Sequence, residues 1–170
     1  MISLIGAPCD AGANTAGSAL GPDALRRAGI QHRLQKTGCK VVDLGDLQIV
    51  APEQDTAVQG YRNFHEVLAW NREVHWAVAN ALKDGNVPVL LGGDHSLAMG
   101  SISAVSAHCR REHKVLRVVW LDAHADFNTA STSITGNMHG MPLTALCGQG
   151  PPELTQLGGF SPALHASQIR

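Results

Sequence analysis

The chain has 170 residues, a formal net charge of −1 and 16% charged residues. That length is enough for one domain with a sizeable core, and the near-neutral charge gives no basic footprint for nucleic acid. No apolar stretch approaches the roughly 20 residues that span a bilayer, and the first residues lack the regions of a signal peptide, so we expect a cytoplasmic protein with no membrane partner. The four cysteines form no CxxC pair, and we expect them to be reduced thiols.

The first part of the chain reads as alternating strands and helices. Residues 2–8 predict a buried strand that glycine and proline end, and residues 39–44 predict a second strand. Between them, Pro22 suits the first turn of a helix that runs to about Lys36. The apolar side of this helix would consist of Ala24, Leu25, Ala28 and Leu34. The glycine-rich loop at residues 11–21 lacks the spacing of a phosphate-binding loop, so we interpret it as a loop on the substrate side.

The alternation continues along the chain. Polar residues 51–59 predict a loop, and a long helix is expected from Gly60 to the stop signal at Asp84-Gly85. An apolar strand at 87–91, a helix at 97–110 and a second apolar strand at 115–121 follow. Strands and helices that alternate at this pitch indicate right-handed βαβ units. The sequence therefore predicts an α/β fold with three α/β/α layers around a parallel sheet.

The strand at 115–121 ends abruptly in an acid, an imidazole and an acid at alternate positions, which are Asp122, His124 and Asp126. Side chains at i, i+2 and i+4 of an extended segment point to the same side. Three such groups repel and dehydrate one another unless a cation lies among them. The pattern favours a metal site, and its alternative is a polar loop in which the three residues occur by chance.

His95 follows the strand at 87–91 and is a candidate fourth ligand. Ligands of parallel α/β sheets bind outside the carboxyl ends of the strands, and both His95 and the Asp122 cluster come at such ends. We therefore expect them to share one crevice. Asp94 would hold His95 or its turn rather than bind the metal itself.

These motifs resemble the ureohydrolase family. The resemblance is carried by Gly92-Gly93-Asp94-His95-Ser96 and by Asp122-Ala123-His124-Ala125-Asp126. Gly136-Asn137-Met138-His139-Gly140 is similar to the arginase branch of the family in particular. The resemblance spans nearly the whole chain and implies an arginase-like fold. It also implies an enzyme that hydrolyses the guanidinium group of L-arginine to L-ornithine and urea.

The family resemblance implies a pair of manganese ions bridged by a carboxylate and a hydroxide. By its positions, His95 and Asp126 would bind one ion, His124 would bind the other, and Asp122 would bridge them. Carboxylate and imidazole ligands without a thiolate suit Mn²⁺. Asp126 would also hold the proton of the hydroxide that attacks the substrate.

Further residues receive roles from the same resemblance. His139 matches a mobile histidine with a proton-shuttle role, which suits an imidazole that titrates near neutral pH. The residues expected to bind the α-carboxylate and α-amino group of arginine are Asn128, Ser133, Thr135 and Asn137. When full length, members of the family are expected to form homo-oligomers, as trimers or hexamers.

One departure separates this chain from the family pattern. The family's third metal motif, Asp-x-Asp after a serine-rich strand, is expected after Asp126, and the sequence has no aspartate beyond that residue. We therefore expect residues 1–170 to form a single partial arginase-like domain that is truncated, inactive alone and able to hold at most one manganese ion weakly. Three alternatives remain: an agmatinase-type guanidino hydrolase, a non-catalytic interaction subunit of the family and, more distantly, a zinc deacetylase of related fold.

Overall fold

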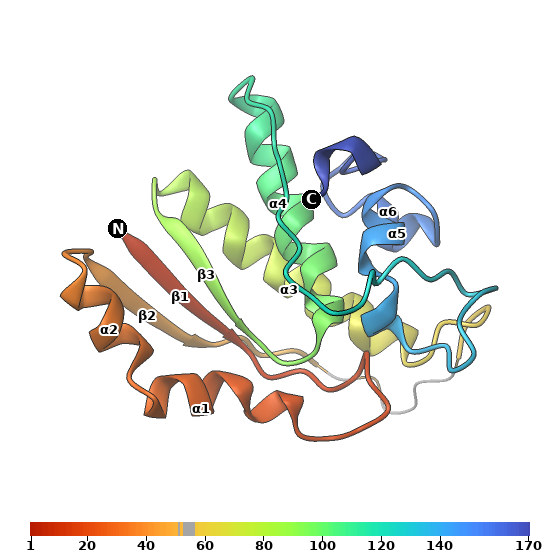
Figure 1. Cartoon of the computed structure of the whole chain (residues 1–170), viewed down its shortest axis with the longest axis horizontal. Helices are drawn as coiled ribbons and strands as arrows, with labels where there is room; N and C mark the ends of the chain where they lie inside the picture. The colour runs from red at the N-terminus through yellow and green to blue at the C-terminus, as the bar shows by residue number, and fades with distance from the viewer. Residues whose placement is uncertain (51, 53–56) are drawn as a thin grey trace.

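The computed structural model describes residues 1–50, 52 and 57–170, and its centre is a three-stranded parallel sheet (Figure 1). The strands are β1 (Ile2–Ala7), β2 (Val41–Asp46) and β3 (Val87–Gly92), in the order β2-β1-β3. β1 and β3 are paired without a register shift, so their carboxyl ends, Ala7 and Gly92, lie side by side. The parallel sheet and the strands near residues 2–8, 39–44 and 87–91 are confirmed.

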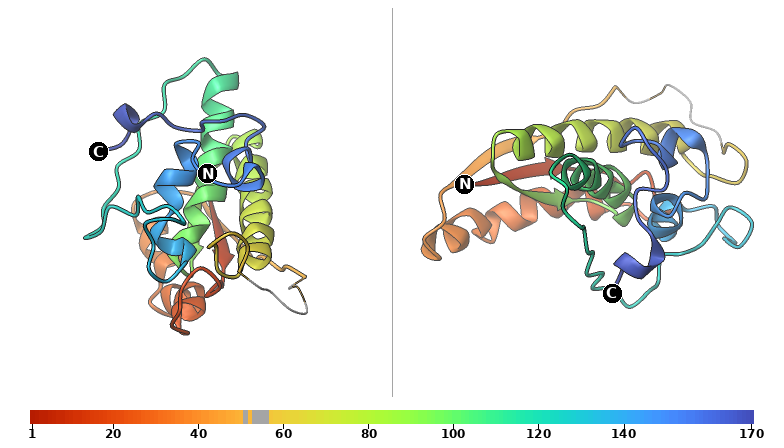
Figure 2. Two further views of the ribbon diagram at one scale, coloured as in Figure 1. Left: turned by 90° about the vertical axis from the view of Figure 1, so that its right-hand side faces the viewer. Right: turned by 90° about the horizontal axis from the view of Figure 1, so that it is seen from above.

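Helices cover the sheet on both faces, as the predicted three layers require (Figure 2). The long helix α3 (Phe64–Lys83) lies on one face, and the helices between β1 and β2 lie on the other. The helix α4 (Ala98–Arg111) follows β3 and packs along α3. The apolar face of α3 buries Val67, Val74 and Val78 against the core, which explains the helical spacing of these residues. None of the described helices is both long and apolar enough to cross a membrane.

The predicted helix from Pro22 to Lys36 is two helices, α1 (Gly21–Arg27) and α2 (Ile30–Lys36). The break occurs at Gly29, which has φ 79°, a left-handed conformation that ends an α-helix and that glycine adopts without strain. The predicted apolar side is also wrong, because Ala24, Leu25 and Ala28 are exposed.

An ion pair links α1 to β2. The guanidinium of Arg26 lies 2.7 Å from Asp43 and also contacts Asp46 on β2. This contact with Arg26 holds the pKa of the Asp43 carboxyl below its usual value, although partial burial acts in the opposite direction.

The long helix begins later than predicted. Residues 51 and 53–56 of the expected loop lie outside the described residues. Gly60 and Asn63 have φ 87° and 50°, so the chain cannot enter a right-handed helix before Phe64. The helix ends at Lys83, and Gly85 has φ 73°, which confirms the predicted stop.

The apolar segment 115–121 is extended but does not join the sheet beside β3, which corrects the prediction of a further sheet strand. It pairs in parallel with the last residues: Val118 N–H donates to Gln168 O at 2.9 Å, and Arg170 N–H donates to Val118 O at 2.9 Å. Its outward side chains, Val119 and Leu121, are 69% and 92% exposed. The segment lies outside the sheet, and among the described residues only 168–170 pair with its backbone. These outward side chains are therefore left open to solvent.

The remaining elements are short helices, which either follow the segment 115–121 or connect the longer elements. They are η1 (Ser18–Leu20), η2 (His95–Leu97), η3 (Met138–Gly140), α5 (Pro142–Leu146), α6 (Pro152–Thr155) and η4 (Ala166–Gln168). The helix α5 contacts α4 and η2, so the chain after the segment 115–121 returns to the carboxyl end of β3.

Candidate metal and substrate site

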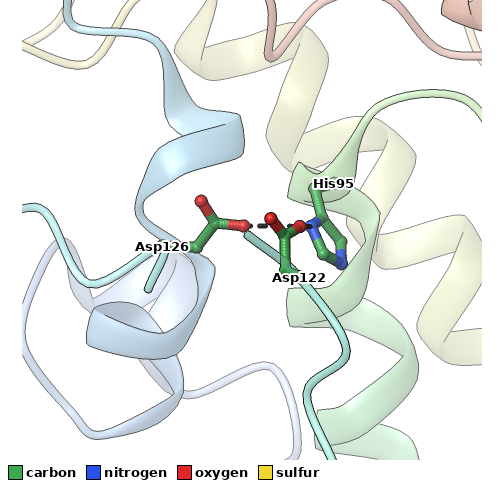
Figure 3. Close-up of side chains that lie close together, drawn as sticks. All are labelled: His95, Asp122 and Asp126. Carbon is green, nitrogen blue, oxygen red and sulfur yellow. Dashed lines mark ion pairs between the residues drawn. The ribbon is translucent and has the colours of Figure 1, made fainter. Parts of the chain in front are cut away.

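Three of the four predicted metal ligands meet at one point (Figure 3). The Nδ1 atom of His95 lies 3.0 Å from Oδ2 of Asp122 and 3.0 Å from Oδ2 of Asp126. One ligand atom from each residue lies within 4.8 Å of the others. The structure therefore brings the two chain segments together at these side chains, while a shared crevice and the role of these residues as ligands stay predictions.

Asp94 fixes the turn that carries His95. Its buried carboxylate accepts the Ser96 N–H at 2.8 Å and thereby caps the short helix η2, which begins at His95. It also accepts the Gly12 N–H at 2.8 Å. Asp94 thus joins the loop after β1 to the loop after β3 and holds the turn, while its described contacts do not include the ring of His95.

The approach of these two loops requires glycine at position 93. A Cβ at Gly93 would lie 2.0 Å from the carbonyl oxygen of Cys9.

The Cys9 thiol is a proton donor to Asp94 at 3.6 Å. Burial raises the pKa of this thiol, and the charge of Asp94 acts in the same direction. Cys9 is therefore a packing thiol that remains protonated at neutral pH.

Asp122 lies between the two histidines of the site. Its Oδ2 faces His95, while its Oδ1 accepts the His124 N–H at 2.8 Å and lies 3.2 Å from Nδ1 of His124. The hydrogen bond from the His124 N–H lowers the pKa of Asp122, and both imidazoles act in the same direction, so the carboxylate is charged at neutral pH. The side chain of His124 is 83% exposed and lies outside the three-residue cluster.

Asp126 has the least exposed carboxylate of the cluster, with 10% of its side chain accessible. Its φ of 46° is left-handed, which turns the chain sharply after the extended segment. After this turn, Asn128 N–H donates to Gly140 O at 3.0 Å, and Leu143 N–H donates to Asp126 O at 3.2 Å. The turn at Asp126 therefore brings the 128–140 loop to the metal cluster.

The donor set of the cluster fits a divalent cation. It offers one imidazole nitrogen and two carboxylates without a thiolate, a combination that suits Mn²⁺ better than a structural zinc site. A cation between the two carboxylates would offset the repulsion of their like charges. Three protein ligands also leave coordination positions for water or for further ligands.

The predicted substrate and proton-shuttle residues line one cavity of about 560 Å³ next to the cluster. Its wall contains His124, Ala125, Asp126, Phe127, Asn128, Ser133, Thr135, Asn137, His139 and Gly140. His139 N–H donates to Gly12 O at 3.0 Å, so the glycine-rich loop supports the turn that carries His139. The 6% exposed Asn137 has an Oδ1 atom without a hydrogen-bond partner among the described residues. A buried acceptor of this kind is suited to a donor on a ligand.

Trp120 is a further residue of the site that was not predicted from the sequence. Its indole stacks on the His95 ring with 4.1 Å between ring centroids and 12° between planes. The alternation that grouped Asp122 with His124 also places Trp120 on the same side of the extended segment, so a signal was present. Phe127, which lines the cavity, had no comparable signal.

The parallel α/β fold and the cluster of two carboxylates and an imidazole beside the sheet are the features of an α/β domain with a candidate metal site, and the comparisons identify the family. Residues 1–163 match the sequence profile of the Arginase family. The chain belongs to this family, which confirms the resemblance.

Individual relatives support the assignment. The chain is 39% identical to arginase from Brevibacillus brevis over 99% of its own length and 55% of that protein. It is 42% identical to human mitochondrial arginase-2 over 94% of its length and 44% of that protein. The structure superposes on arginase from Bacillus caldovelox with a TM-score of 0.89 and 41% identity, and covers 56% of that chain. The chain thus spans about half the length of the curated relatives it matches.

A structure of a putative agmatinase from Clostridium difficile is more distant. Its TM-score is 0.63 at 18% identity, which shows a shared fold only.

Proposed function

We propose that the chain is part of a manganese-dependent arginase that hydrolyses the guanidinium group of L-arginine to L-ornithine and urea. The observation that carries the proposal is the junction of the His95, Asp122 and Asp126 cluster with a cavity lined by neutral polar side chains. A dinuclear manganese centre, when bound, supplies Lewis-acid activation of the water that attacks the guanidinium carbon.

The chain's own residues would hold the metals unequally. His95, Asp122 and Asp126 would hold one ion, and Asp122 with His124 would contribute to the other. The contacts of Asp122 with both imidazoles support a bridging role for its carboxylate. Of the predicted ligands, only Asp122 and His124 belong to the second metal position. This chain alone would therefore hold at most one ion weakly and release negligible urea.

The other cavity residues would bind the substrate and move protons. Asp126 would accept a proton at its carboxylate, and His139 would carry a proton at its imidazole to the leaving amine or to solvent. Asn128, Ser133, Thr135 and Asn137 would bind the α-carboxylate and α-amino group. Neutral hydroxyls and amides can do so, directly or through water, without adding charge beside the metals.

We expect arginine rather than agmatine as the substrate, because agmatine lacks the α-carboxylate that these polar groups would recognise. A non-catalytic role in an assembly is the alternative to this activity, and the chimera described below distinguishes the two. From the family resemblance we also propose that residues 1–170 form one partial domain and that the complete protein is a cytoplasmic homo-oligomer, either a trimer or a hexamer.

The test is a chimera that joins this chain to the part of Bacillus caldovelox arginase beyond the matched region. Loaded with Mn²⁺, the chimera is expected to release urea from L-arginine much faster than from agmatine. Asp126→Asn should abolish the activity, while Asp84→Asn at the exposed end of α3 serves as the matched control. Equal turnover of the two substrates would favour the agmatinase alternative, and a folded, metal-loaded but inactive chimera would favour the non-catalytic one.

A further inference from the structure

Trp120 provides a flat contact surface for the candidate metal ligand His95. The two rings are nearly parallel, with 4.1 Å between centroids and 12° between planes. His95 needs such a contact, because 40% of its side chain is exposed. An exposed imidazole samples several rotamers, and a ligand that must be fixed on binding loses affinity through that lost freedom.

The position of Trp120 is set by the backbone and by apolar packing. Trp120 N–H donates to Arg170 O at 2.8 Å, in the parallel pairing that also holds Val118. The indole packs against an apolar cluster that contains Leu143 and Leu146. Its buried Nε1 has no hydrogen-bond partner among the described residues, so ring packing and the main chain place this side chain.

The carboxylates contact His95 at one edge of its ring only. Oδ2 of Asp122 and Oδ2 of Asp126 each lie 3.0 Å from Nδ1 of His95. The stack with Trp120 contacts the ring face, so it restricts the tilt of the imidazole that these edge contacts leave free.

We propose that Trp120 is a positioning residue of the metal centre, which stacks on His95 and directs its Nδ1 toward Asp122 and Asp126. The inference rests on the proposed metal site and adds a residue to it. Aromatic pairs of this kind contribute about 0.5–1.5 kcal/mol beyond area burial, which corresponds to about a two- to thirteenfold change in metal affinity.

The experiment is a titration of the purified 170-residue chain with MnCl₂, followed by the EPR signal of free Mn²⁺. Trp120→Ala and Trp120→Leu are expected to weaken binding about two- to thirteenfold, while Trp120→Phe, which keeps a flat ring, should bind more tightly than either and close to the unmodified chain. Trp76→Ala is the matched control, because this tryptophan lies on α3 and is 65% exposed. Mn²⁺ should also quench indole emission in the unmodified chain, and this quenching should be lost in Trp120→Phe.

A double-mutant cycle with His95→Ala separates positioning from general packing. If Trp120 acts through His95, Trp120→Leu should have no further effect on the residual affinity of the His95→Ala chain. Equal affinity of the Leu, Phe and unmodified chains would overturn the proposal, as would an equal loss in both backgrounds. Trp120→Leu decides the outcome if Trp120→Ala fails to fold by circular dichroism. If the unmodified chain binds no Mn²⁺, the proposed metal site itself fails and this inference fails with it.

Discussion

Replacement of Asp94 is expected to destabilise the fold and the site together. Asp94 is 8% exposed and accepts the Gly12 and Ser96 N–H groups, each at 2.8 Å. Asp94→Ala would leave both donors without this acceptor, at a cost of about 1–3 kcal/mol each. Because the two losses are not strictly additive, we expect a total of about 2–5 kcal/mol. With a urea m-value of about 2 kcal/mol/M, the unfolding midpoint should fall by about 1–2.5 M.

The assay is urea unfolding followed by far-UV circular dichroism, with Asp94→Asn and Asp84→Ala in parallel. Asn can accept one of the two hydrogen bonds, so its loss should be about half that of Ala. Asp84 is exposed, and its replacement should change stability by less than about 0.5 kcal/mol. A drop of less than about 1 kcal/mol for Asp94→Ala, or equal effects of Asp94→Ala and Asp84→Ala, would refute the assigned role of Asp94.

Three other predictions follow from single contacts. In Gly100→Ala, the new Cβ would lie 2.3 Å from Asn71 O, so α3 and α4 must separate; we expect a loss of about 1–3 kcal/mol in urea unfolding, and unchanged stability would contradict the close packing. The pKa of Asp43 is lowered chiefly by Arg26, so the ion pair should add about 1 kcal/mol to the stability of the fold above about pH 4, and this should be lost as the pH falls further. In Asp43→Asn this acid-dependent part of the stability should be absent. Identical pH profiles of stability for the variant and the unmodified chain would argue against the pair. In the full-length chimera, Asn137→Ala should reduce kcat/KM for arginine by about one to two powers of ten and affect agmatine far less, whereas equal losses would remove this residue from recognition of the α groups.

Periodicity and stop signals predicted the parts of the fold whose structure is decided locally. The apolar spacing in α3 and the Asp84-Gly85 signal located the body and the end of that helix. The break at Gly29 was not predicted, since a glycine inside a helical pattern is often tolerated. The segment 115–121 has the composition of a buried strand, but its burial depends on which strands lie beside it, and no local pattern contains that information.

The metal cluster, the cavity and Trp120 differ in how far the sequence predicted them. The rule that ligands gather at strand ends brought His95 to Asp122 and Asp126, although the segment before Asp122 lies outside the sheet. The cavity residues came from the resemblance alone, because a polar loop has no periodicity to place its side chains. Trp120 was missed because its apolar ring was taken as part of a buried strand.

The central claim is that this chain carries one nearly complete metal position and only part of a second. Its most direct test is a Mn²⁺ titration of the purified 170-residue chain by EPR, with urea release from L-arginine measured on the same samples. We predict at most one weakly bound ion per chain, with lower affinity still in His95→Ala, and negligible urea production. Two tightly bound manganese ions with arginine turnover would contradict this account, because the second position would then have ligands that neither the sequence nor the described structure identifies.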